Sequence, residues 1–358
     1  MSLGPIAPPV GGVGSAGTSS TLGAPPQTAT PQSATAPQAL ASPLLAVLND
    51  LLMQALPAQD SLAPLLADLS AAAGNPALPA PAQATAQQIL ATQTPLDGAA
   101  TAGDLKAAVA SSGLFLEAGL GAALQAGGGA PDLASDLKGL LLQLIDQLSP
   151  DVEAAAAQEA LTTPASARRA QASGSNSRPP PPARDGATSA QPAADASLDA
   201  ETSGASLIHA LRQDAQGALA RVQLSQLASL PKPGSAPQWS FDLPVAAPQG
   251  RAMAQFRVSR DDRRPGAALD APPTWRARFS LDVEPLGPIH AEVMMSGERT
   301  RVTLWGEREI GHASLAAGQA ELTADLAQTP GADAAVRVLP GAPAAPAVAA
   351  GRLLDRTS

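Results

Sequence analysis

Aromatic residues are confined to one part of this chain, and their distribution is the strongest constraint on where a core can form. Six of the seven Phe and Trp residues lie between Trp239 and Trp305, whereas the 238 residues before them contain only Phe115. Large rings supply much of the apolar area that a protein core buries. We therefore expect one compact domain near the C-terminus, preceded by a long region poor in core-forming side chains.

The composition of the chain agrees with this division. Hydrophobic residues make up 45% of the sequence, but many of them are Ala, which contributes little buried area to offset the entropy lost on folding. The 36 Pro and 31 Gly among 358 residues approach the proportion found in low-complexity sequences. We expect residues 1–100 to form a disordered Pro/Ala/Gln/Thr-rich tail that contains short helices.

Charge and cysteine content exclude several functions. The net charge is −9 and the first basic residue is Lys106, so the sequence shows no basic patch of the kind that nucleic acids require. The absence of Cys excludes disulfides, thiolate zinc sites and thiol chemistry. Residues 1–14 lack the pattern of a secretory signal peptide, and no apolar run reaches about 18 residues, so we expect no membrane insertion.

Leucine spacing predicts helices within the first half of the chain. Two short Leu-rich helices are expected between residues 43 and 73, limited by Pro57 and Pro64, and residues 74–100 return to a linker composition. Such short helices are marginal in water when isolated.

Residues 101–150 are predicted to form a helical hairpin. Thr101 and Asp104 have the spacing of a capping box that begins a helix over residues 104–125, and a second helix runs from Asp132 to Pro150. Residues 151–204 have the composition of a disordered linker, and residues 205–238 are read as a helix followed by a linker. The Pro tract 179–182 within that linker predicts a short polyproline II segment.

From Trp239 onward the apolar period changes from helical to two, which predicts strands. The short turns between the later strands require an antiparallel meander, because a parallel return needs a crossover of a dozen or more residues. A helix over residues 307–328, thinned by Gly311 and Gly318, and a short strand at residues 336–339 follow. The helix is expected to cover the face of the sheet that carries Trp305.

The predicted fold class is therefore a mostly disordered N-terminal region with short helices, followed by an α+β domain over residues 239–340 with an antiparallel sheet and one packed helix. Residues 341–358 are predicted to be a disordered tail. The predicted core of the domain is Trp239, Phe241, Leu243, Phe256, Trp275, Phe279, Leu281, Val283, Val293, Val302, Leu304 and Leu322.

No catalytic, cofactor or metal site is predicted. His290 and Glu292 have the H-x-E spacing of zinc deaminases, but that site also needs paired cysteines. We read them as a solvated pair on the polar face of a strand. His209 and His312 have no matching ligand spacing, and no Ser/His/Asp set is evident. We therefore expect that the protein is not an enzyme.

Four sequence stretches together resemble one family. They are Trp239-Ser-Phe-Asp-Leu-Pro-Val245, Trp275-Arg-Ala-Arg-Phe-Ser-Leu-Asp-Val283, Pro285-Leu-Gly-Pro-Ile289 and Arg301-Val-Thr-Leu-Trp-Gly-Glu307. Their order and spacing over residues 239–340 are similar to the C-terminal domain of flagellar hook-length control proteins. Two features depart from the family pattern: the order Glu284-Pro285 is reversed, and Gly311 and Gly318 thin the helix.

The resemblance implies a protein that is cytoplasmic first and is then exported through the flagellar type III apparatus to the hook lumen and the exterior. Its N-terminal part would act as a molecular ruler of hook length. Its C-terminal domain would meet the cytoplasmic domain of the export gate's switch component and change the substrate class from hook to filament subunits. Contacts with the hook cap and hook subunits during export are also implied, and we expect a monomer without cofactors.

A ruler role is geometrically possible. Residues 1–238 would span at most roughly 750 to 850 Å if fully extended, and less wherever helices persist. Two alternatives remain open on the sequence, a needle-length regulator of a virulence type III secretion system and a Pro/Ala-rich surface structural protein. The exposed turn Pro285, Leu286, Gly287 and Pro288 is our hypothesis for the partner-binding site.

Overall fold

The computed structural model describes residues 38–95, 100–127, 133–160, 178–198, 202, 204–232, 235–247, 250–261, 272–328 and 333–344. Residues 1–37 and 96–99 of the predicted N-terminal tail and residues 345–358 of the predicted C-terminal tail lie outside the described residues. The chain divides into two units, residues 1–45 and 46–358, and the description below concerns the second unit. Helix α1 crosses the boundary between them.

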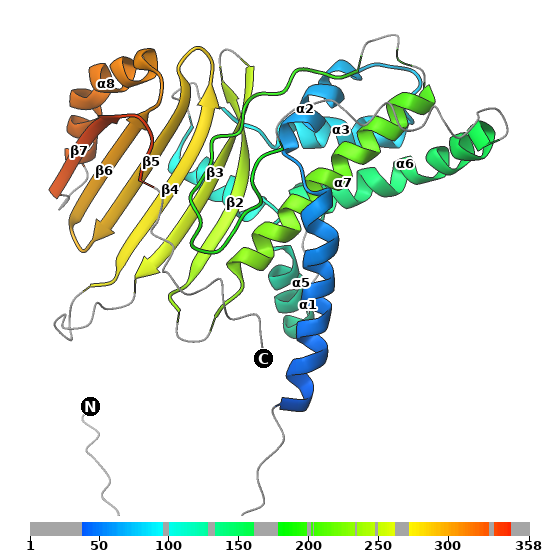
Figure 1. Ribbon diagram of the computed structural model, residues 1–358, viewed down its shortest axis with the longest axis horizontal. Coiled ribbons are helices and arrows are strands. Elements are labelled where there is room, and N and C mark those ends of the chain that lie inside the picture. Colours follow the sequence, from blue (N-terminus) through cyan, green and yellow to red (C-terminus); the bar gives the residue numbers. More distant parts are fainter. Residues whose placement is uncertain are drawn as a thin grey trace, which may run out of the picture. The chain divides into compact units, whose positions relative to one another are not determined.

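The first half of the chain is helical (Figure 1). None of the helices among the described residues is both long enough and apolar enough to cross a membrane. The elements are α1 (Gln38–Ala58), α2 (Leu62–Ala71), α3 (Ala80–Ala91), α4 (Ala102–Ala110), α5 (Leu116–Ala126), a 3-10 turn (Leu133–Ser135), α6 (Leu137–Ala160) and α7 (Gly204–Ser229).

The helix over residues 205–230 is confirmed as α7, but several other predicted boundaries were wrong. Helix α3 occupies residues expected to be linker, and α6 continues through Pro150, which removes one backbone hydrogen bond without ending the helix. Pro64 does not limit a helix, because it lies in the first turn of α2, where its missing N–H would have no partner.

The single helix predicted over residues 104–125 is instead two helices. The capping box is confirmed, since Asp104 N donates to Thr101 Oγ1 at 3.2 Å. The break falls at Gly113, whose φ is +86° and where a Cβ would lie 2.9 Å from Lys138 Cβ. The predicted hairpin was also wrong, because α6 packs mainly on α7 and α3.

Leucine and alanine, rather than aromatic residues, build the main core of the structure. Helices α2, α3, α6 and α7 bury a continuous apolar cluster, to which β3 contributes Met253. We call this arrangement the helical layer. Its most deeply buried large side chains include Leu65, Leu66, Leu69, Ile89, Leu140, Leu141, Leu144, Leu148, Leu207 and Leu211. The expectation that this region lacks the side chains to form a core was therefore wrong for the described helices, since closely packed Leu side chains bury enough apolar area by themselves.

A seven-stranded sheet follows the order β1-β2-β3-β4-β5-β6-β7. The antiparallel meander is confirmed from β2 to β6, but both outer pairs, β1 with β2 and β6 with β7, are parallel. The sheet is thus mixed, because β7 returns through helix α8 and β1 arrives from the first half of the chain. The elements are β1 (Thr94–Pro95), β2 (Gln238–Ala247), β3 (Gly250–Asp261), β4 (Thr274–Val283), β5 (Gly287–Ser296), β6 (Arg299–Gly306), α8 (Glu309–Ala327) and β7 (Asp333–Pro340).

Strand register separates an apolar face from a polar face of the sheet. Phe241, Phe256, Phe279, Ala291 and Leu304 form one cross-strand row of the apolar face. Successive Phe rings of this row have centroids 5.4 and 5.2 Å apart. The polar face carries the residues between them, including Arg257, Ser280 and His290.

Helix α8 lies on the apolar face, not on the face of Trp305. Gly306 continues the apolar row of Val302 and Leu304, and a Cβ at Gly306 would meet His312 N at 2.5 Å. Trp305 points to the opposite face, in register with His290. The prediction that α8 covers Trp305 was therefore wrong, because alternation along β6 places Trp305 and Gly306 on opposite sides.

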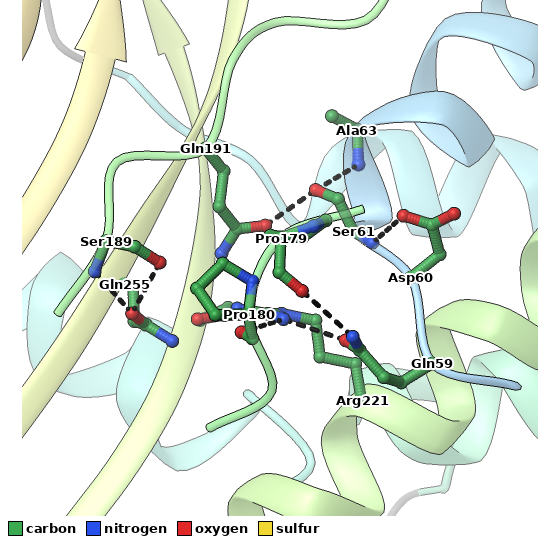
Figure 2. A network of polar contacts seen from close by, with 11 residues as sticks. Gln59, Asp60, Ser61, Ala63, Pro179, Pro180, Ser189, Gln191, Arg221 and Gln255 are labelled. Atoms are coloured by element: carbon green, nitrogen blue, oxygen red, sulfur yellow. Dashed lines mark hydrogen bonds and ion pairs between the residues drawn. The ribbon is translucent and has the colours of Figure 1, made fainter. Parts of the chain in front are cut away.

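Residues 178–198, expected to be disordered linker, form an ordered extended segment that we call the strap. It runs over the polar face of β3 and β4, where Ser189 N donates to Gln255 Oε1 at 2.7 Å and Thr188 Oγ1 lies 2.7 Å from Ser280 Oγ. Figure 2 shows its contacts with the helices: Ser61 Oγ donates to Gln191 Oε1 at 2.7 Å. Gln191 is fully buried, which fixes the strap between the helical layer and the sheet.

The Pro tract at the start of the strap is held by α7 and by the end of α1. Gln59 Nε2 donates to the Pro179 carbonyl at 2.9 Å, and Arg221 Nη1 donates to the Pro180 carbonyl at 3.1 Å (Figure 2). A polyproline II segment makes no internal hydrogen bonds, so its carbonyls are available to side-chain donors. The predicted polyproline segment therefore takes part in the packing of the fold.

A substitution pair in α6 tests whether the helical layer is a true core. Leu144 is fully buried and Leu142, two residues earlier, is 47% exposed. We expect Leu144→Ala to lower the free energy of unfolding by about 2–5 kcal/mol, through lost burial and a residual cavity. Leu142→Ala should change it by less than about 0.5 kcal/mol in urea denaturation. Equal effects would show that this region does not pack as described.

Two carboxyl groups meet inside the helical layer. Asp68 of α2 accepts hydrogen bonds from Ser197 N at 2.6 Å, Ser197 Oγ at 2.6 Å and Leu198 N at 3.2 Å, and so holds the end of the strap. Asp214 of α7 lies beside it. Burial, followed by the negative charge of Asp68, raises the pKa of Asp214 to about 7.

This carboxyl pair makes stability depend on pH in a defined direction. Because the pKa of Asp214 is higher in the folded state than in the unfolded chain, the folded state binds more protons between about pH 4 and 7. The contribution of the protonated Asp214 carboxyl to the free energy of unfolding is complete below pH 4 and is lost as the pH rises through 7. The free energy of unfolding falls over this range by up to about 1.4 kcal/mol per pH unit. We expect Asp214→Asn to flatten this part of a urea-measured stability profile, and an unchanged slope would contradict the assignment.

Candidate functional site

The turn that sequence analysis nominated joins β4 to β5 and has a specific backbone shape. The Glu284–Pro285 peptide bond is cis, and Gly287 has a φ of +77°. A Cβ at Gly287 would lie 2.4 Å from Arg308 Cδ. Glycine is therefore required there both for the left-handed backbone and for the close approach of the arginine side chain.

The beginning of α8 packs directly against this turn. A Cβ at Gly311 would lie 2.5 Å from the Leu286 carbonyl oxygen, so only a glycine lets the helix come this close. Glu307 N donates to the Pro288 carbonyl at 3.1 Å. Gly311, which the sequence analysis treated as a weakness of the helix, instead makes the contact possible. We call the turn 284–288 and residues 307–311 the turn–helix junction.

An ion pair covers the solvent side of the junction. Arg308 donates to both carboxylate oxygens of Glu284, at 2.7 and 2.9 Å. These hydrogen bonds lower the pKa of Glu284 and raise the pKa of Arg308. Both groups face water, so the pair contributes little stability, but its two-pronged geometry fixes the orientation of the side chains.

The four nominated residues differ in exposure. Pro285 is exposed, Leu286 and Pro288 are half-buried, and Gly287 is buried. The structure adds Glu284 and Arg308 to the exposed surface, and Ile310, two residues after Arg308 in the sequence, is 52% exposed. No sequence spacing indicated this group, because Glu284 and Arg308 are far apart in the sequence and meet only when α8 folds against the turn. The partner-binding role of the turn stays a prediction.

The predicted core residues are buried to different degrees. Phe241, Leu243 and Val302 are buried, whereas Trp275 is 38% exposed and lies 6.2 Å from Trp239, ring centroid to centroid, on the apolar face. Trp275 was therefore wrongly assigned to the core. The remaining residues of the predicted core are half-buried: Trp239, Phe256, Phe279, Leu281, Val283, Val293, Leu304 and Leu322.

The polar face contains a chain of hydrogen bonds that resembles a catalytic triad. Ser280 Oγ lies 2.7 Å from His290 Nδ1, and His290 Nε2 lies 2.8 Å from Glu307 Oε1. Ser280 is completely buried, and the hydroxyl of Thr188 in the strap lies 2.7 Å from its oxygen. A substrate carbonyl cannot approach such a hydroxyl, so the arrangement does not support nucleophilic catalysis. It attaches the strap to the sheet.

The H-x-E pair also has a structural role. The sequence analysis expected a solvated pair, but His290 is buried. Glu292 forms an ion pair with Arg278. The two side chains therefore have different partners. Among the residues that the structure describes, no group of three His, Cys, Asp or Glu side chains is arranged to hold a metal ion.

Comparison with known protein families identifies the domain that contains the turn–helix junction. Residues 263–340, from before β4 to the end of β7, match the family described as flagellar hook-length control protein FliK. This part of the chain is a flagellar hook-length control domain. The match confirms the resemblance over most of residues 239–340, and it includes the whole turn–helix junction. No curated protein and no solved structure matched the chain in the other comparisons.

Two glycines of α8 in the hook-length control domain give a matched test of the junction. Gly311→Ala should destabilise the fold by about 1–3 kcal/mol, because its Cβ would collide with the Leu286 carbonyl. Gly318 has no atom within 4 Å of a Cβ, so Gly318→Ala should stabilise by about 0.5–1 kcal/mol through better helix propensity. Thermal or urea unfolding measures both. A stabilising Gly311→Ala would mean that α8 does not touch the turn.

Proposed function

We propose that this protein controls flagellar hook length and is itself a substrate of the flagellar type III apparatus. The observation that carries the proposal is the match of residues 263–340 to the hook-length control family. In this proposal the C-terminal domain changes the export apparatus from hook-type to filament-type substrates. The protein is made in the cytoplasm and leaves through the hook lumen.

The turn–helix junction is the proposed contact with the cytoplasmic domain of the export gate's switch component. It includes an exposed apolar side chain, Ile310, and an exposed pair of opposite charges, Glu284 and Arg308, a combination that suits a specific protein contact. Its backbone is fixed by Gly287 and Gly311, so little conformational entropy is lost on binding. This combination supports the junction more strongly than the turn sequence alone.

Export requires the helical layer and the sheet to unfold. The chain has no Cys, so no disulfide opposes unfolding. The helices are held together by Leu and Ala packing and by a limited set of side-chain hydrogen bonds to the strap. The extended length estimated for residues 1–238 therefore applies to the unfolded chain in transit, and in that state we propose that it measures the hook. Contacts with hook cap and hook subunits belong to the same stage.

The family match favours the flagellar role over the two alternatives, the needle-length regulator and the surface structural protein. A needle-length regulator would share the same physical plan. Removing the gene distinguishes the two roles, because a flagellar regulator changes the length of the hook and a needle-length regulator changes the length of the needle.

The decisive experiment measures hooks by electron microscopy in a strain that lacks this gene. We expect hooks of uncontrolled length and few filaments, with both defects corrected by the wild-type chain. Leu286→Ala should fold with nearly unchanged stability but fail to restore filaments, whereas Gly318→Ala in the same domain should restore them. Normal hooks in the deletion strain would reject the proposed function. Full correction by Leu286→Ala would reject only the junction as its contact site.

A further inference from the structure

A cavity of about 270 Å³ lies where the beginning of the strap meets the polar face of the sheet. Its wall comes from the strap, from the segment between α7 and β2, and from strands β2, β3 and β4. Four of its ten lining residues are arginines. These arginines are Arg184, Arg257, Arg276 and Arg278, and Asp185 and Asp261 line the same cavity.

The arginines of the cavity are placed unfavourably close to one another. Arg257 and Arg278 are direct cross-strand partners on β3 and β4, and Arg276 lies on the same face of β4. Like charges directly opposite in a sheet are destabilising. Burial, followed by the charge of Arg278, lowers the pKa of Arg257, which agrees with positive charge that is incompletely compensated. A chain with a net charge of −9 gathers these cations at one place although its sequence shows no basic run.

Carboxylates of the wall compensate only part of this charge. Arg278 pairs with Glu292, while Arg184 and Arg257 donate to backbone carbonyls, Arg257 to that of Ala183 at 2.8 Å. Asp185 and Asp261 are the acidic residues that line the cavity.

Arg276 is the least satisfied of the four arginines. Its nearest carboxylate oxygens, on Asp261 and Glu292, are both 3.9 Å away, beyond hydrogen-bonding distance. No described residue accepts a hydrogen bond from its buried Nε. A buried guanidinium N–H without an acceptor is costly. The Arg276 side chain is 28% exposed and lines the cavity, so its charge is open to an oxyanion there.

We propose that this cavity is a binding site for a phosphate-type oxyanion, with Arg276 as its principal ligand and Arg257 and Arg278 as supporting charges. The volume of about 270 Å³ leaves room for a small anion together with ordered water. Arginine forks match the geometry of phosphate oxygens. Because Arg184 and Asp185 belong to the strap, the bound anion would fasten the strap to the sheet.

The test measures binding of inorganic phosphate to the whole chain by calorimetry and thermal unfolding, at constant ionic strength maintained with NaCl. We expect saturable binding and a rise in Tm that NaCl alone does not produce. Arg276→Gln should weaken phosphate binding at least about tenfold, and Arg276→Lys, which keeps the charge but loses the fork, should weaken it less. Acetate should bind more weakly than phosphate.

Arg299 provides the matched control, since it also lies on a strand of this sheet, but its side chain is 84% exposed and does not line the cavity. Arg299→Gln should bind phosphate like the wild type. Circular dichroism verifies that each variant is folded. Equal phosphate effects in Arg276→Gln and Arg299→Gln, a rise in Tm that NaCl reproduces, or tighter binding of acetate would each overturn the proposal.

Discussion

The packing of the helices, the strap and the sheet depends on one buried cation. The side chain of Arg221 in α7 is only 3% exposed and forms an ion pair with Asp242 of β2. The same guanidinium donates to Gln59 at 2.9 Å and to the Pro180 carbonyl of the strap. A buried charge is tolerated only when it is paired and hydrogen-bonded. The partners of Arg221 come from segments far apart in the sequence, so all of them must be in place for this charge to be satisfied.

This dependence links the two halves of the chain into one folded unit. Helices α2 and α7 pack directly against β3 and β2. The strap fills the polar face with side chains that match the hydrogen-bonding groups of Gln255 and Ser280. The hook-length control domain is therefore not independent of the residues before it in this structure. Opening of the helical layer would remove contacts that hold β2 and β3.

The two faces of the sheet serve different purposes. The polar face is covered by the strap, whose hydrogen bonds are specific but contribute modestly one by one. The apolar face is covered by α8 at β6 and β7, and it keeps half-buried Phe side chains on β3 and β4. The turn–helix junction lies where α8 begins. Close contact at Gly306 and Gly311 makes the junction rigid although much of its surface faces water.

Local patterns in the sequence determined the elements that depend on local physics. Period-two alternation placed the strands β2 to β6, short turns made β4 to β6 antiparallel, and Thr101 and Asp104 fixed the start of α4. Pro285 and Leu286 were correctly read as a turn, whereas Gly287 and Pro288 begin β5. The family resemblance was carried by the same stretches.

Only the tertiary structure decided what covers each face and which distant side chains meet. Aromatic content was a poor guide to the helical layer, because Leu side chains that come together from four helices bury area that no single helix reveals. Three groups are brought together only by folding. They are Ser280 with His290 and Glu307, the pair Glu284 and Arg308, and the arginines of the cavity, which come from the strap, β3 and β4. The sequence determines strands, turns and caps, since these depend on neighbours along the chain. The sites depend on contacts between remote residues, which are set by packing.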